Sequence, residues 1–346
     1  MTRQSNIELL RIWAMFCIAL HHFCFHGGVC AEVQNAAVLL NANIAAMSLT
    51  EAVTYIGVNC FILISGYCGI RFSARKVVGL YLMCAFYGLI GYFCNLVYYA
   101  QPFAAQEMLR ASVFCFSKDY WWFINCYALL MLFAPFLNSG IKALSHRQFG
   151  WLIAGWSIAQ IYFGYLTHTA YFDTGYGYNV LNFVYIYLIG AYLRRYVSRE
   201  TVRARRRTWL IVYVTGTLLW AGLTCWAHLQ HLPWWRINAY NNPVLILNAV
   251  MLFMYAVSFE FHSERINWMA SGVLGVYLLQ DHWIKGETPV CYMLFKDMFG
   301  ATALGGKYMA AIAASVILLV TVCVFDRLRV RLFRPLLKYI PDKTEE

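Results

Sequence analysis

Ten apolar runs, most of them about 20 residues long, dominate this chain, and a helix of that length crosses the hydrocarbon core of a bilayer. Only 12% of the 346 residues are charged and 61% are hydrophobic, unlike a soluble domain. We predict an all-α, polytopic membrane protein: one integral-membrane domain over 1–346, with about ten transmembrane helices within roughly 7–329 and a basic cytoplasmic tail at 330–346. The runs lie near 7–27, 51–70, 76–100, 120–138, 149–168, 179–197, 208–229, 243–261, 268–284 and 307–327.

Lysine and arginine are unevenly divided between the two sides of such a protein. If every run crosses the membrane, 20 of the 27 basic residues fall on the side of the N-terminus and six on the other. Cytoplasmic loops carry the excess of these residues, so we predict that both termini are cytoplasmic and that the protein is multi-pass in the cell (inner) membrane. This distribution accounts for the net charge of +11, so we expect membrane lipids and no nucleic acid as partners. The oligomeric state stays open.

The twelve cysteines lie mostly within apolar runs and show no C-x-x-C spacing. Such cysteines are typical of small buried hydrophobic side chains and do not indicate zinc ligands or a disulfide framework. By spacing alone His22 and His26 would suit a helical metal pair, but we expect no metal. Three carboxylates near the ends of runs are interpreted as interfacial charges: Glu51, Glu260 and Asp281.

The first run contains both an arginine and histidines. In one helix, the eleven steps from Arg11 to His22 return to nearly the same face roughly 16 Å further along, while His21 points elsewhere. Charge in a membrane helix is costly, so ionisable residues there indicate a functional site by default. The alternative for His22 is a purely structural role, in which its imidazole forms a hydrogen bond that joins two helices. We interpret Arg11 and His22 as the pair around which the other helices are arranged.

Several short motifs carry a family resemblance. The first run holds Asn6-Ile-Glu-Leu-Leu-Arg11 and His21-His22-Phe, the second Ser65-Gly66-Tyr67, the fourth Trp121-Trp122-Phe123-Ile, and the ninth Tyr277-Leu-Leu-Gln-Asp-His282. Together they resemble the membrane-bound acyltransferase-3 family, whose bacterial members use acetyl-CoA to acetylate surface polysaccharides and lipid-linked sugars. The most specific element is the Arg-x10-His pattern of Arg11 and His22, and the resemblance extends over nearly all ten runs.

The resemblance implies an O-acetyltransferase with acetyl-CoA as co-substrate and a carbohydrate or lipid-linked sugar as acceptor. It makes His22 the catalytic histidine and Arg11 a residue that holds or orients the donor. It also implies an Arg-x-x-Arg pair after the second helix, but here the spacing is one residue longer, so the contacts with the coenzyme phosphates fall among Arg71, Arg75 and Lys76. The residues carried over for the substrate are Trp122, Tyr277 and His282.

Acyl transfer from a thioester to a hydroxyl requires a base, and a neutral His22 in apolar surroundings suits that task. We favour direct transfer over an acyl-enzyme on Ser65, which has no base adjacent in sequence. The densest basic cluster, over 194–207, predicts contact with anionic lipid. It also supplies Arg194 and Arg195 as candidate phosphate contacts for CoA.

The sequence is also compatible with another class of function. Arg11, His22 and His282 would also fit the proton path of a coupled transporter or exporter of a glycolipid or small solute. The sequence shows no internal repeat of the kind many transporters have, and few membrane carboxylates, which favours the enzyme. The acceptor sugar, the modified position and the choice between acetyl, succinyl and longer acyl donors are not determined by the sequence.

Overall fold

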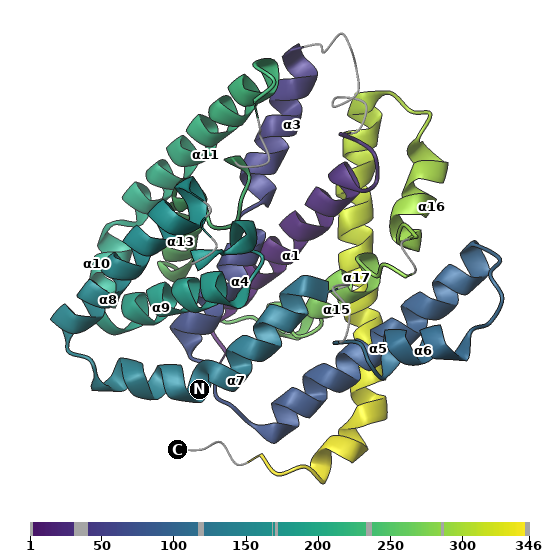
Figure 1. Cartoon of the computed structure of the whole chain (residues 1–346), viewed down its shortest axis with the longest axis horizontal. Helices are drawn as coiled ribbons and strands as arrows, with labels where there is room; N and C mark the ends of the chain where they lie inside the picture. The colour runs from purple at the N-terminus through teal and green to yellow at the C-terminus, as the bar shows by residue number, and fades with distance from the viewer. Residues whose placement is uncertain are drawn as a thin grey trace. The chain divides into compact units, whose positions relative to one another are not determined.

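The computed structural model describes residues 3–30, 41–116, 121–167, 169, 172–232, 237–284 and 287–342. In this part of the chain the regular structure is helical apart from an isolated bridge between Ile284 and Glu287 (Figure 1). The chain forms two compact units, each assembled from three segments. The first unit comprises Met1–Cys17, Val38–Arg71 and Cys126–Asn267, and the second comprises Ile18–Ala37, Phe72–Asn125 and Trp268–Glu346.

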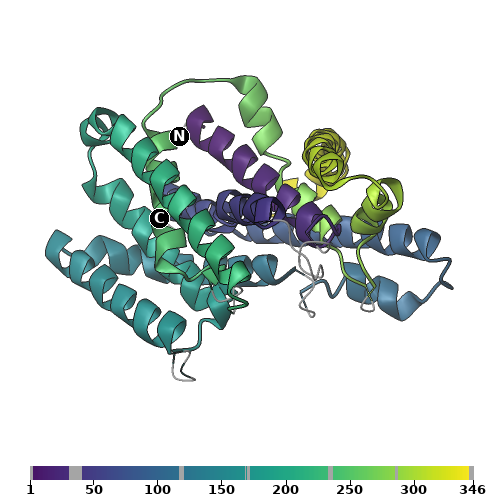
Figure 2. The same cartoon turned by 90° about the horizontal axis from the view of Figure 1, so that it is seen from above.

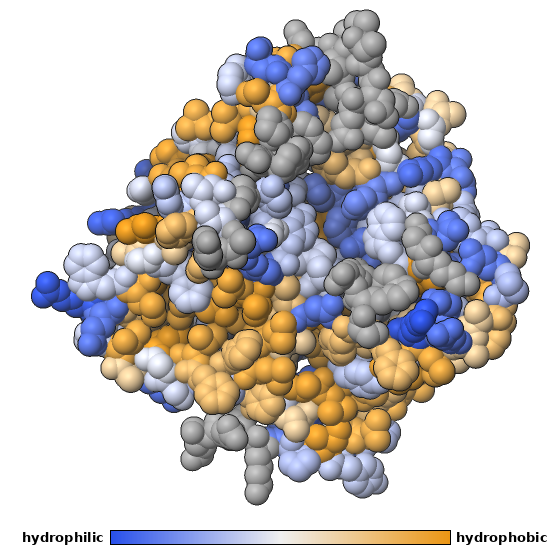
Figure 3. Space-filling model, in the orientation of Figure 1, coloured by the Kyte–Doolittle hydropathy of each residue, from blue (hydrophilic) through white to orange (hydrophobic). Residues whose placement is uncertain are grey.

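Six helical stretches among the described residues are long and apolar enough to cross a membrane. They are α1 (Ser5–Phe25), the stretch Asn43–Cys68 that joins α3 (Asn41–Thr54) to α4 (Gly57–Cys68), α5 (Ala74–Tyr98), α7 (Trp122–Ala143), α11 (Arg206–Leu229) and α17 (Leu304–Lys338). Hydrophobic side chains also cover broad areas of the surface in Figure 3. The prediction of an all-α, multi-pass membrane protein is therefore confirmed.

The count of about ten spans is not confirmed. The other four predicted ranges hold helices shorter than the 18 residues required of a span. The range 268–284 is interrupted near Gly272, where the N–H groups of Gly272 and Gly275 bond three residues back along the chain. These shorter elements are α8 (His146–Ala159) with the π-helix η2 (Gln160–Leu166), α9 (Val180–Tyr196), α13 (Pro243–Val257), α14 (Glu264–Ala270) and α15 (Leu274–Gln280).

In the first unit, α4 packs closely on α9, and α11 lies between α3 and α13 (Figures 1 and 2). The contact of α4 with α9 depends on Gly66 and Gly190. A Cβ at Gly66 would lie 2.1 Å from the carbonyl oxygen of Tyr187, and one at Gly190 would lie 2.5 Å from that of Leu63. Small residues allow membrane helices to approach this closely. Two short helices, η4 (Gly175–Gly177) and α10 (Arg199–Ala204), complete the unit.

In the second unit, α5 contacts α6 (Ala105–Ser112), α15, α16 (Val290–Phe299) and α17. A buried carboxylate joins two of these helices: Asp326 on α17 accepts a hydrogen bond from the Tyr87 hydroxyl of α5 at 3.1 Å. Arg329 pairs with both oxygens of Asp326, at 2.6 and 2.9 Å. The amide of Gln280 donates to the carbonyl of Ala19 at 3.0 Å, which attaches the end of α15 to α1.

Candidate functional site

Helix α1 carries both residues of the Arg-x10-His pattern. It is unbroken over 21 residues, so the helical rise places Arg11 and His22 about 16 Å apart on nearly the same face. The helix passes from the first unit to the second between Cys17 and Ile18. Arg11 therefore has its surroundings in the first unit and His22 in the second.

Arg11 is held by a carboxylate one turn earlier in α1. Its Nη1 donates to Oε2 of Glu8 at 2.8 Å, and the Glu8 side chain is only 8% exposed against 28% for Arg11. This role of Glu8 was not predicted from the sequence, although the i, i+3 spacing of a carboxylate and a guanidinium is a known helical pairing signal. The pair fixes the direction in which the guanidinium projects.

The start of α1 is tied to the segment that follows α13. The Ser5 hydroxyl accepts from the N–H of Ser263 at 2.8 Å and donates to Oδ1 of Asn267 at 2.9 Å. The Asn6 amide donates to the carbonyl of Ala256 at 3.1 Å. These buried polar contacts attach the helix that carries Arg11 to the 256–267 segment of the same unit.

His22 is half-buried among aromatic rings of the second unit. Its ring centroid lies 6.2 Å from that of Tyr277 and 6.3 Å from that of Tyr292, the latter in an edge-on arrangement. The ring of His26 is 5.6 Å away. The Nδ1 atom of His22 is buried and makes no hydrogen bond in the described part of the chain. The structure thus places two separately predicted site residues, His22 and Tyr277, beside each other.

Asp281 organises the aromatic side of this cluster. Its Oδ1 accepts from Nε1 of Trp283 at 2.8 Å and from the Tyr292 hydroxyl at 3.1 Å, and the residue is 7% exposed. Asp281, which the sequence suggested to be an interfacial charge, is thus buried and accepts hydrogen bonds from two neighbouring rings. Glu51 is likewise buried, and the Asn238 amide donates to it at 2.7 Å.

His26 lies just beyond the end of α1 and packs on the same rings. Its centroid is 5.3 Å from Tyr292 and 5.6 Å from Trp283. His26 therefore belongs to the same aromatic cluster as His22.

The other predicted substrate residues lie beside this cluster in different ways. His282 is 1% exposed and packs against Gly91 of α5 and the ring of Trp121, whose centroid is 5.0 Å away. Trp122 is half-buried at the start of α7. The ring centroid of the next residue, Phe123, lies 6.1 Å from that of Tyr277.

The residues predicted to meet the coenzyme phosphates differ in how they are engaged. Arg71 and Lys76 are exposed, whereas Arg75 donates from Nε and Nη2 to the carbonyl of Ile340 and pairs with Asp342. Arg194 places its guanidinium 5.2 Å from the ring centroid of Tyr67. Arg195 donates to the carbonyl of Ile141 and lies over the ring of Tyr196.

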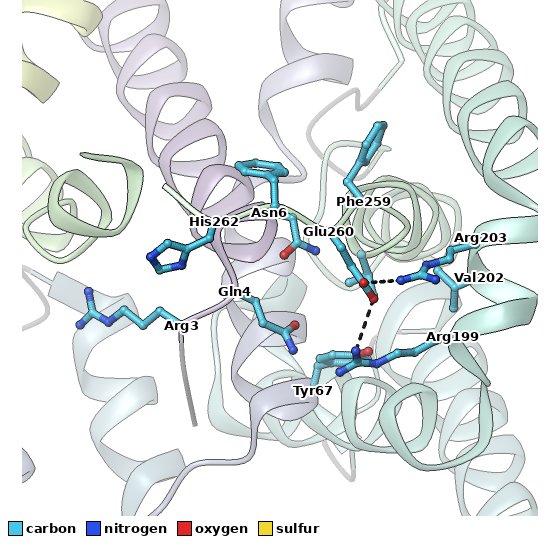
Figure 4. Close-up of a pocket in the computed structure, with 12 residues that line it drawn as sticks. Arg3, Gln4, Asn6, Tyr67, Arg199, Val202, Arg203, Phe259, Glu260 and His262 are labelled. Atoms are coloured by element: carbon cyan, nitrogen blue, oxygen red, sulfur yellow. Dashed lines mark hydrogen bonds and ion pairs between the residues drawn. The ribbon is translucent and has the colours of Figure 1, made fainter. Parts of the chain in front are cut away.

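A cavity of about 420 Å³ opens in the first unit, at the beginning of α1 (Figure 4). Its walls come from that helix start, the end of α4, the short helix α10 and the 257–262 segment. Arg199 and Arg203 point from α10 toward Glu260, and both pair with its carboxylate. Sequence reasoning placed these arginines in the basic 194–207 cluster without singling them out, although their i, i+4 spacing on a helix puts them on one face.

Fold and site define a multi-pass membrane protein with a half-buried, aromatic-lined histidine and a paired arginine on its first spanning helix. The acyltransferase-3 family model, described as an acyltransferase domain, matches residues 4–325. The chain belongs to the acyltransferase-3 family and is a membrane acyltransferase, as the sequence resemblance implied. Neither the curated proteins nor the solved structures gave a match.

Proposed function

We propose that this acyltransferase moves an acetyl group from acetyl-CoA, supplied from the cytoplasm, to a hydroxyl of a cell-surface or lipid-linked carbohydrate. The observation that carries the proposal is the setting of His22. It is half-buried beside Tyr277 and Tyr292, it has a ring nitrogen without a hydrogen-bond partner in the described chain, and it shares α1 with Arg11. Membership of the acyltransferase-3 family indicates that the reaction is the transfer of an acyl group.

In the proposed reaction, His22 accepts the proton of the acceptor hydroxyl as the oxygen forms a bond to the thioester carbonyl carbon. The carbon–sulfur bond then breaks, and His22 returns its proton to the departing thiolate, so the imidazole ends neutral. The aromatic rings packed beside His22 would limit the access of water, which could otherwise hydrolyse the thioester. Arg11 supplies a positive charge on the same helix face for orienting the donor.

Direct transfer is favoured over an acyl-enzyme on Ser65. The Ser65 hydroxyl donates to the carbonyl of Phe61 at 2.9 Å, four residues earlier in α4. This bond is the common arrangement of a serine within a helix and engages the proton that a nucleophile would have to lose. An activated serine would instead donate to a neighbouring base.

The test compares H22A with H21A, which removes the adjacent imidazole from the same helix. Cells carrying each variant are analysed for acetyl groups on surface glycans and lipid-linked intermediates by mass spectrometry. Loss of a general base lowers the rate by about 10²–10⁴-fold, so H22A should abolish acetylation while membrane levels of the protein stay normal. H21A should keep most of the activity. Acetylation by H22A at the original rate would refute the assignment.

A further inference from the structure

The cavity at the beginning of α1 has an excess of positive charge. Among the described residues that line it are three arginines, Arg3, Arg199 and Arg203, and one carboxylate, that of Glu260. Arg3 donates to the carbonyl of Asn267 at 2.9 Å and extends away from the other two, so the anion-binding element is the pair on α10 (Figure 4). Two guanidinium groups that converge on one point favour an anionic ligand.

Glu260 already occupies that point in the way a phosphate would. One carboxylate oxygen lies 3.3 Å from Nη1 of Arg199, and the other pairs with Nη2 of Arg203. Phosphate presents oxygens to guanidinium groups in the same manner. The three side chains are each about half exposed, and ion pairs with that exposure contribute little to stability. An incoming phosphate can therefore replace the carboxylate at little cost to the fold.

The remaining walls suit a nucleoside better than a bare phosphate or a lipid headgroup. The side chain of Gln4 faces the cavity and offers both a donor and an acceptor (Figure 4). Phe261, another lining residue, is 41% exposed, and an exposed aromatic face is a common stacking partner for a base. A lipid headgroup shares the phosphate but has no base to use these groups.

We infer that this cavity binds the phosphorylated adenosine of the acyl-CoA donor, with Arg199 and Arg203 on a phosphate that displaces Glu260. The inference rests on the proposed function for the identity of the donor. It assigns the phosphate to residues other than the contacts predicted from the sequence, which were Arg71, Arg75, Lys76, Arg194 and Arg195. Asn6 of the cavity wall and His22 lie on the same helix, α1.

The experiment measures binding to the full-length protein in nanodiscs of phosphatidylcholine. The ligands are CoA, 3′-dephospho-CoA and adenosine 3′,5′-bisphosphate. R199Q/R203Q removes two charged partners and should weaken binding of CoA and of the bisphosphate by about 10- to 100-fold. R205Q/R207Q makes the same charge change at exposed positions of the same basic cluster that do not line the cavity, and should bind like wild type.

Glu260 provides a test with the opposite sign. E260Q removes the carboxylate that competes with the phosphate, so CoA should bind several-fold more tightly than to wild type. A purely structural role of Glu260 would give weaker binding, because the arginines would lose the group that holds them. Weaker binding to E260Q would overturn the displacement.

Other outcomes separate this inference from the proposed function. H22A should bind CoA normally, because this substitution removes the proposed general base and none of the residues that line the cavity. If wild type binds CoA and R199Q/R203Q binds it equally well, the cavity assignment fails while the donor assignment stands. If wild type binds none of the three ligands, the assignment of acyl-CoA as the donor is itself refuted. A lipid site would show an effect of R199Q/R203Q only in discs containing phosphatidylglycerol, and that result would overturn the inference.

Discussion

Arg11 and Glu8 form an ion pair in which the carboxylate is the more deeply buried partner, with 2.8 Å between Nη1 and Oε2. Removal of the guanidinium leaves a buried carboxylate without its partner, which costs about 1–3 kcal/mol. We therefore expect R11A to lower both activity and thermal stability in detergent. The double variant E8Q/R11Q removes both charges, so it should regain much of the lost stability and still be inactive.

The pair of Glu107 and Arg110 on α6 is a matched control for that experiment. It has the same i, i+3 spacing and a distance of 2.9 Å, but both partners are more exposed, at 40% for Arg110 and 14% for Glu107. Because an ion pair contributes less as its exposure to solvent grows, R110Q should lower the melting temperature less than R11A does. If E8Q/R11Q remained as unstable as R11A, the stability loss would come from something other than the unpaired carboxylate.

The sequence predicted the helical class of the fold well, because apolar runs of the required length leave few alternatives in a membrane. The long helix α1 and the shared face of Arg11 and His22 follow from helical periodicity alone. Span lengths were less predictable: hydropathy does not show that the chain turns near Gly272. This turn separates two seven-residue helices, α14 and α15, where a single span was expected.

The site was predicted only where its residues lie on one helix or share the family motifs. The resemblance predicted Tyr277 as a substrate residue but not its packing against His22, and the bonds to Asp281 join residues whose burial the local sequence does not reveal. The cavity depends on contacts between α10 and a segment some 60 residues later, so Glu260 looked like an ordinary interfacial charge. Long-range pairing of this kind is not contained in composition or spacing.

The packing of His282 against α5 predicts a strong effect of a small substitution. A Cβ at Gly91 would lie 2.5 Å from Nδ1 and 2.6 Å from Cγ of His282, which is buried and cannot move aside freely. Overpacking of this kind costs about 1–3 kcal/mol, so G91A should lower the melting temperature. On the same helix, a Cβ at Gly79 meets only Leu337 at 4.0 Å, so G79A should be neutral or stabilising.

A smaller side chain at position 282 tests the cause of that instability. The double variant G91A/H282A removes the ring that the new methyl group would strike, and it should melt at a higher temperature than G91A. If the double variant were no more stable, the damage in G91A would arise from another contact of α5.

Asp281 should act on catalysis through the rings that it holds. Asparagine at this position loses the charged acceptor shared by Trp283 and Tyr292, and a hydrogen bond to a charged group is worth about 1.5–3 kcal/mol. Because Tyr292 packs edge-on to His22, we expect D281N to lower kcat about 10-fold with little change in KM for acetyl-CoA. Y292F keeps the ring and should have a smaller effect.

The exposed pair of Tyr98 and Asp297, with 2.5 Å between the hydroxyl and Oδ2, offers the same chemistry away from His22. D297N should therefore leave kcat unchanged. Equal losses of kcat in D281N and D297N would show that the effect is general destabilisation, since only Asp281 shares an aromatic partner with His22.

Arg75 uses its donors on the end of the chain. Its Nε and Nη2 donate to the carbonyl of Ile340 at 3.1 and 2.9 Å, and the Ser73 hydroxyl donates to Asp342 at 2.8 Å. We expect R75Q to increase cleavage of the C-terminal segment in limited proteolysis and to leave KM for acetyl-CoA within about twofold, because these contacts hold backbone and not ligand. R334Q, at an exposed position of α17, is the control. A tenfold rise in KM for R75Q, together with a lower KM for D342A, would instead show that Arg75 contacts the coenzyme phosphates and that Asp342 competes with them.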